Sequence, residues 1–138
     1  MKNFKLIIAL LLAPFAANAQ PPQGISYQAI AFSGAGLPVV NSTVGVKISI
    51  LDNSASGTVV YSETHAPLTN SQGLYNLNIG QGTPLSGTFS GISWGQNSKF
   101  IKVELDPAGG TSYTSSGTSQ LMSVPYALYA ESVNPGAR

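Results

Sequence analysis

The sequence predicts an all-β protein: an antiparallel β-sandwich of about seven short strands, followed by one short C-terminal helix. Three observations lead to this prediction. Apolar and polar residues alternate with a period of two in several short runs, as in strands with one buried face. Turn-forming residues (Gly, Pro, Asn and Ser) separate these runs about every ten residues. Helical periodicity is absent until the C-terminal end of the chain.

The N-terminal residues have the features of a secretory signal peptide. Lys2 and Lys5 give a positive start, residues 6–12 are apolar, and Ala17-Asn18-Ala19 is a small-residue cleavage site. This apolar run is too short to span a membrane, and no later run is long enough. We therefore expect export to the periplasm, the cell surface or the medium. The expected division is a leader at 1–19, an extended lead-in at 20–24, one sandwich domain with its helix at 25–133, and a tail at 134–138.

The charge balance argues against nucleic acid and anionic lipid as partners. Without the leader, four basic residues (Lys47, Lys99, Lys102 and Arg138) stand against five acidic ones, so the formal net charge moves from +1 to 4 − 5 = −1. Both of those partners require a basic patch. The chain has no cysteine, which excludes disulfides and a lipid-modified N-terminal cysteine.

The stretch from residue 68 to 82 gives the clearest local structure. Asn70 begins a turn, and we expect Gly73 to hold a positive φ there, since glycine adopts that geometry without steric strain. Directly after the turn, Tyr75, Leu77 and Ile79 share one face of a strand, with asparagines on the other face. This strand therefore requires a partner that covers its apolar face.

Other runs supply the partner strands. Strands are expected at 25–33, 37–40, 44–51, 58–65, 100–105, and as a final pair at 111–114 and 119–124. Residues 83–95 are less regular, with Phe89, Ile92 and Trp94 as anchors and Trp94 as a plug in the core. The apolar faces predict one shared core containing Val46, Ile48, Ile50, Leu77, Ile79, Ile101 and Val103.

The expected C-terminal helix begins at Pro125, because proline is well suited to the first position of a helix. Val124, Ala127 and Leu128 share one face that could pack on the sandwich. Tyr126 and Tyr129 would face away from it. Two interpretations stay open: a terminal cap, or a junction in which the two tyrosines contact a neighbouring subunit or domain.

Three segments resemble a known family. YSETHAPLTNSQGLYNLNIGQG, FSGISWGQNSKFIKVELDPAGGTSY and GTSQLMSVPYALYAESV are similar to the N-terminal module of secreted and surface proteins of the Bacteroidota, often labelled tail-fibre-like or collagen-like. Thr69, Gly73, Tyr75 and Leu77 are also similar to the turn-and-strand signature of transthyretin-like sandwiches, such as carboxypeptidase regulatory domains. The resemblance implies a transthyretin/immunoglobulin-like sandwich that is non-catalytic and displayed outside the inner membrane. Relatives continue into another segment where this chain stops, so we expect either a solitary module or a piece of a longer protein.

No set of residues predicts a catalytic, cofactor or metal site. Glu63 and the single histidine, His65, share a strand face, but acid–base catalysis requires a third group and a pocket. We interpret them as an exposed or edge-strand pair beside Tyr61. Asp52-Asn53-Ser54 is interpreted as an Asx-type turn rather than a calcium loop, and Asp106 as a turn-initiating residue rather than a cation ligand.

Two functions from different classes remain. The first is a non-enzymatic structural or interaction module of a surface or extracellular assembly, with a protein partner or self-association. The second is a small carbohydrate-binding domain, suggested by Trp94, Tyr75, Tyr113, Tyr126 and Tyr129, because aromatic faces stack on sugars. An exposed apolar patch or edge strand favours the first, and a groove of coplanar aromatic rings beside amide side chains favours the second.

Overall fold

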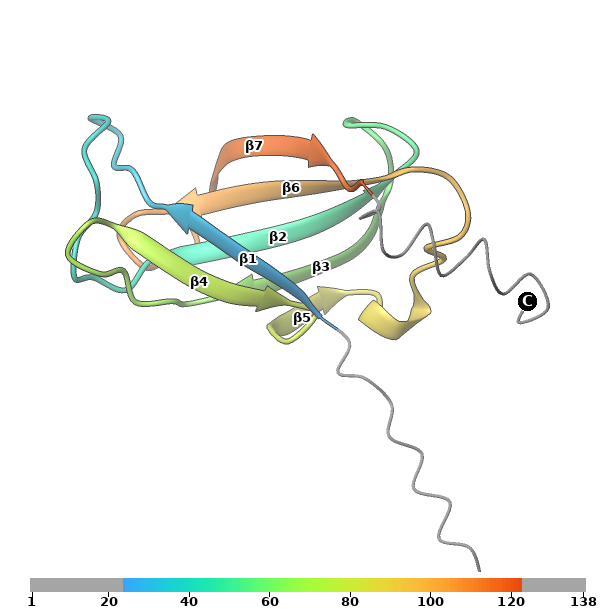
Figure 1. The fold of residues 1–138 in the computed structure, drawn as a ribbon, viewed down its shortest axis with the longest axis horizontal. Coiled ribbons are helices and arrows are strands. Elements are labelled where there is room, and N and C mark those ends of the chain that lie inside the picture. The colour runs from blue at the N-terminus through green and yellow to red at the C-terminus, as the bar shows by residue number, and fades with distance from the viewer. Residues whose placement is uncertain (1–23, 123–138) are drawn as a thin grey trace, which may run out of the picture.

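Seven strands and one short 3-10 helix make up the fold in a computed structural model that describes residues 24–122 (Figure 1). The elements are β1 (Ile25–Ile30), β2 (Gly45–Asp52), β3 (Val59–His65), β4 (Leu74–Ile79), β5 (Thr83–Ser86), the 3-10 helix η1 (Phe89–Gly91), β6 (Lys99–Asp106) and β7 (Thr114–Gln120). Within this described part, no helix is long and apolar enough to cross a bilayer.

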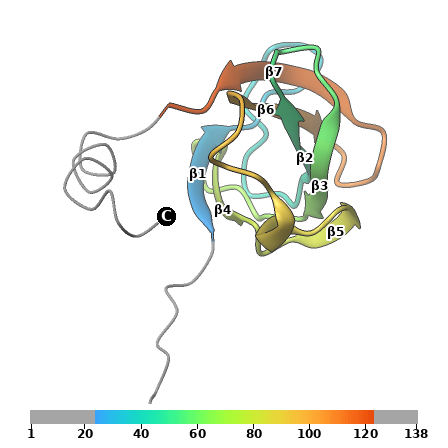
Figure 2. The ribbon, with the colours of Figure 1, turned by 90° about the vertical axis from the view of Figure 1, so that its right-hand side faces the viewer.

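The strands form two antiparallel sheets. The larger sheet has five strands in the order β5-β3-β2-β6-β7, and the smaller one pairs β1 with β4. Figures 1 and 2 show β1 and β4 lying across one face of the larger sheet. The all-β, antiparallel architecture predicted from the sequence is therefore confirmed.

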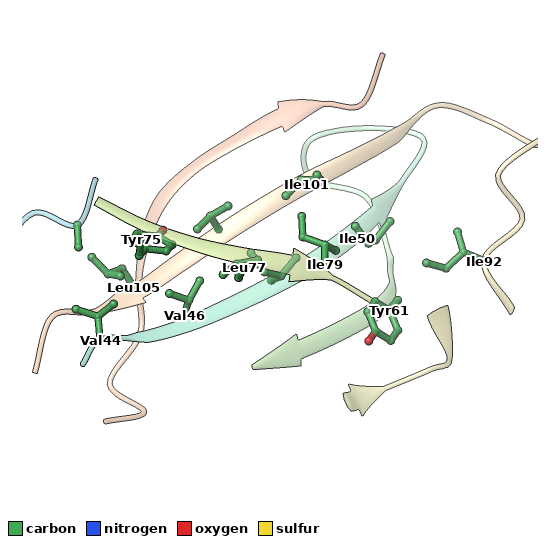
Figure 3. Close-up of a cluster of buried hydrophobic side chains, with 13 residues drawn as sticks. Val44, Val46, Ile50, Tyr61, Tyr75, Leu77, Ile79, Ile92, Ile101 and Leu105 are labelled. Atoms are coloured by element: carbon green, nitrogen blue, oxygen red, sulfur yellow. The ribbon is translucent and has the colours of Figure 1, made fainter. Parts of the chain in front are cut away.

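One apolar core lies between the two sheets. The inward side chains of β4 face those of β2, β3 and β6 (Figure 3). All seven residues predicted to share a core are buried: Val46, Ile48, Ile50, Leu77, Ile79, Ile101 and Val103. Burial alternates with a period of two along β4 and most of β6. In β2 the inward face is buried as predicted, and Ser49 and Leu51 of the opposite face are buried as well.

The predicted turn before β4 is confirmed in detail. The Asn70 side chain accepts hydrogen bonds from the backbone N–H groups of Gln72 (2.8 Å) and Leu74 (3.0 Å). The N–H of Gly73 donates to the Asn70 carbonyl, and Gly73 has φ of +82°. The turn thus sets the start of β4.

A hairpin outside the named strands projects from the end of β1 (Figure 1). Phe32 and Pro38 face each other across it, and Ser33 donates to the Leu37 carbonyl at 2.8 Å. Ala31 is fully buried, whereas Ile30, Phe32, Pro38 and Val40 are exposed. Since side chains alternate along a strand, these four form one apolar outer face. The strand expected at 25–33 therefore ends at Ile30 and continues into this hairpin.

Three other expectations change. The final strand pair at 111–114 and 119–124 is wrong: one strand, β7, pairs with β6, because Asp106 begins a longer turn that reaches Ser112. The irregular stretch contains β5, which pairs with β3 at the edge of the sheet. The helix expected after Pro125 lies outside the described residues.

Candidate functional site

A buried carboxylate, Glu63, is the most highly organised polar group of the described chain. Its side chain is 0% exposed and accepts four hydrogen bonds. Oε1 accepts from His65 Nε2 at 2.6 Å and from the Gly80 N–H at 2.8 Å. Oε2 accepts from the Tyr61 hydroxyl and from the Gly82 N–H at 3.2 Å. All four donors surround one carboxylate, as a buried charge requires.

The donors come from two parts of the fold. Tyr61, Glu63 and His65 alternate along β3, so their side chains lie on the same, core-facing side. Gly80 and Gly82 belong to the connection that carries the chain from β4 in the small sheet to β5 in the large one. Glu63 therefore fixes the crossing between the sheets. A Cβ on Gly82 would lie 2.5 Å from His65 Nε2 and 2.6 Å from the Thr64 carbonyl oxygen, so only glycine allows this approach.

The electrostatics favour the ionised form of Glu63. Burial by itself raises the pKa of a carboxyl group, but the hydrogen bonds from Tyr61, His65, Gly80 and Gly82 outweigh it and leave the pKa of Glu63 below its ordinary value. Burial first, and then the neighbouring Glu63 carboxylate, raise the pKa of the Tyr61 hydroxyl above its usual range. Tyr61 therefore stays protonated as a donor.

The expectation of an exposed or edge-strand pair at Glu63 and His65 is wrong. β3 lies between β5 and β2, and β5 occupies the edge. Tyr61 does lie beside Glu63, as expected, and its hydroxyl donates to the Glu63 carboxylate. Because each carboxylate oxygen already accepts two hydrogen bonds, the arrangement is suited to holding the fold together rather than to taking a proton from a substrate.

An open hollow of about 460 Å³ lies beside His65. Its wall includes the neutral side chains of Thr64, Gln81, Thr83, Thr111 and Tyr113, together with backbone at Gly45, Gly82, Gly109 and Gly110. These hydroxyl and amide groups can donate and accept hydrogen bonds, and Tyr113 adds one aromatic ring. The hollow could hold a small neutral polar ligand.

Asp52 begins a turn as predicted, but its carboxylate is not used as in an Asx turn. The Ser54 N–H donates to the Asp52 backbone carbonyl at 2.8 Å, and Asn53 has φ of +71°. The carboxylate instead pairs with Lys99 at 2.9 Å, which, ahead of smaller effects, holds the pKa of Asp52 below its usual range. The buried Lys99 ammonium also donates to the Gln96 carbonyl.

Asp106 is a turn residue, as predicted. Oδ1 accepts from the Ala108 N–H and Oδ2 from the Ser112 N–H, both at 3.0 Å. Among residues 24–122, no three His, Cys, Asp or Glu side chains are grouped so that they could hold a metal ion.

The members of the aromatic set that lie within residues 24–122 do not form one platform. Tyr75 is buried in the core, and Tyr113 lines the hollow. Trp94 is 43% exposed, so its prediction as a core plug is wrong. Ile92 occupies the core instead, and Trp94 stacks edge-on against Phe89 with ring centroids 5.6 Å apart. Tyr126 and Tyr129 lie outside the described residues.

The role of Gly80 and Gly82 was not predicted from the sequence. A signal was available: Glu63 shares the inward face of its strand with Tyr61, and a buried carboxylate requires donors. The paired glycines after β4 are free to offer backbone N–H groups.

Comparison with known families gives one match. Residues 26–121 match the family described as Domain of unknown function (DUF8740), which covers more than half of the chain and all of the strands described above except the first residue of β1. Comparison with curated proteins and with solved structures found no match. The chain therefore belongs to the DUF8740 family.

Proposed function

We propose that this chain is a non-enzymatic structural and interaction module, exported by its leader and acting in a surface or extracellular assembly. The observation that supports this most directly is the apolar outer face of the hairpin, formed by Ile30, Phe32, Pro38 and Val40. Phe32 is 51% and Ile30 45% exposed. Contiguous exposed apolar surface is typical of protein–protein contacts.

The position of the hairpin supports the same role. Gly24 lies beside the end of β4, and Leu121 donates to the Lys99 carbonyl at the start of β6. The hairpin lies at the opposite end of the sheets (Figure 1). The described domain thus begins and ends away from the hairpin, and within residues 24–122 the outer face of the hairpin is uncovered. The proposed architecture is a transthyretin/immunoglobulin-like sandwich, completed by the helix after Pro125.

The test compares exported wild-type protein with a Phe32→Ser, Val40→Ser double variant in the native cell. Release of the variant from the cell-envelope or extracellular assembly, at an unchanged melting temperature, would support the module. Val59→Ser provides a matched control, because Val59 is similarly exposed but lies outside the hairpin. Equal retention of all three proteins would contradict the proposed role, and mass spectrometry of the mature N-terminus would test cleavage after Ala19.

A small carbohydrate-binding domain is the second candidate, favoured by the hollow beside His65. Its wall carries hydroxyl and amide groups with one aromatic ring, Tyr113, which suits a sugar. A glycan array that gives a hit lost on Tyr113→Ala would support it. No binding by folded protein across the array would remove this candidate.

A further inference from the structure

The two-stranded sheet has an exposed edge that differs from the edges of the larger sheet. Natural proteins protect edge strands with proline, short length, bulges or charge, because unprotected edges pair with other chains. β5 is four residues long and contains Pro84. β7 carries a register shift opposite Val103 and Glu104. Both outer edges of the five-stranded sheet therefore have a protective feature.

β4 is closed off by its own connections. Before it, the chain comes from β3, and Thr69 and Ser42 exchange hydrogen bonds. After it, Gly80 and Gly82 are held by Glu63 of β3. The connections at both ends of β4 cross to the larger sheet, so an added strand would have little room to run along it.

β1 has none of these protections. Its sequence, ISYQAI, contains no proline and no charged residue, and its pairing with β4 shows no register shift. Within residues 24–122, β1 pairs with no strand other than β4. Ala31 bonds to Gly73 and Val39, which adjoin each other, so both of its partners lie on the β4 side. Within the part of the chain that the structure describes, the open edge thus runs from Gly24 to Phe32.

Among residues 24–122, nothing covers the core completely along this edge. The inward side chains of β4 are buried: Tyr75, Leu77 and Ile79. Those of β1 remain partly exposed: Ile25, Tyr27 and Ala29. Another strand beside β1 would cover them, as edge addition does in strand-augmented complexes.

We infer that the β1 edge pairs antiparallel with the β1 edge of a second copy of this chain, about a two-fold axis at Gln28. Gln28 is the midpoint of the open edge, so pairing about an axis at Gln28 uses the full length of that edge. Directly opposite residues in an antiparallel pair share one face, which places Ser26 opposite Ile30 and Phe32 opposite Gly24. The strand carries no charge, so no like charges meet. Isologous pairing of this kind closes as a dimer.

This inference rests on the proposed interaction role, but it is tested by a different measurement: self-association of the purified protein. Sedimentation of the protein as cells release it, over a concentration series, should give a dimer. Gln28→Lys places two like charges at the axis and should raise the dimer Kd by about tenfold or more. Thr118→Lys on the exposed β7 strand is the matched control and should leave the Kd unchanged.

Cysteine cross-linking locates the axis. The chain has no native cysteine, so Gln28→Cys introduces one thiol per copy. Directly opposite Cβ atoms lie about 5 Å apart, within reach of a short bifunctional thiol reagent. Gln28→Cys should cross-link to a dimer, and Thr118→Cys should not.

Three results would overturn the inference. They are a monomer at every concentration, a dimer that Gln28→Lys leaves intact, and equal cross-linking of both cysteine variants. A monomer whose amides at 26–30 resist hydrogen exchange would show that residues of the same chain cover the edge. Phe32 belongs to both surfaces, whereas Val40 lies outside the β1 edge. The retention test with Val40→Ser alone therefore separates the two proposals, because a hairpin contact with another protein does not require the dimer.

Discussion

The backbone N–H of Gly80 donates a 2.8 Å hydrogen bond to Oε1 of Glu63, and this contact joins the two sheets. Gly80 follows β4 of the small sheet, whereas Glu63 belongs to β3 of the large one. The Glu63 carboxylate also accepts hydrogen bonds from Gly82, Tyr61 and His65. One buried charge therefore organises the connection from β4 to β5. Buried polar groups that are fully hydrogen-bonded favour one arrangement of a core over others.

Glu63→Gln should lower the free energy of unfolding by about 3 kcal/mol, measured by denaturant melts at neutral pH. The amide NH2 would face N–H or O–H donors that now point at a carboxylate oxygen. Glu104→Gln is the matched control. Glu104 pairs with Lys47 at 3.8 Å and with Lys102 at 3.4 Å near the surface. Glu104→Gln should therefore lower the free energy of unfolding by less than about 1 kcal/mol. Equal losses would contradict the role assigned to Glu63.

Acid should weaken the protein through the same group. The folded-state pKa of Glu63 is depressed, so its stabilisation is present above the unfolded pKa of about 4.3 and is lost as pH falls through the lower folded value. The stability difference between wild type and Glu63→Gln should therefore be constant near neutrality and shrink below about pH 4. Denaturant melts across this range test it. A difference that grows in acid would reverse the assigned direction of the shift.

Gly73→Val should destabilise the fold by at least about 1 kcal/mol. Gly73 has φ of +82°, and a Cβ there would lie 3.0 Å from Pro38 Cβ. Gly34→Val is the control, because a Cβ at Gly34 meets nothing within 4 Å. Thermal melts of both variants should separate a strained site from a permissive one, and equal melting temperatures would argue against strain at Gly73.

The sequence predicted the strands well wherever one face is apolar and the other polar. Val46, Ile48 and Ile50 lie in the core because alternation with a period of two admits only one inward face. The Asn70 turn was also readable, since its hydrogen bonds are local.

The candidate site was less predictable because its partners are distant in the chain. Gly80 and Gly82 lie 17 and 19 residues after Glu63, and their N–H groups carry no side-chain signal. The prediction that Trp94 fills the core failed for another reason. Large aromatic residues usually fill cores, but here Ile92 takes the buried position and leaves the indole half-exposed against Phe89.

Ile48→Ala should lower the free energy of unfolding by about 2–5 kcal/mol, because Ile48 is fully buried and the truncation leaves a cavity. Val59→Ala, at a half-exposed site, is the control and should change stability by less than about 1 kcal/mol. A loss below half a kcal/mol at Ile48, judged against the Leu/Ile→Ala range, would contradict the assignment of this face.

Ile48 should also be coupled energetically to Glu63. The two residues lie directly opposite each other on β2 and β3, on the same inward face. Truncation of Ile48 would open a cavity beside the Glu63 carboxylate, which water could enter to reach the carboxylate and its donors. The losses of Ile48→Ala and Glu63→Gln should then fail to add, with an interaction free energy of at least about 0.5 kcal/mol in a double-mutant cycle. The same cycle with Val59→Ala in place of Ile48→Ala should be additive. Additivity in both cycles would mean that the apolar core and the Glu63 cluster contribute to stability independently.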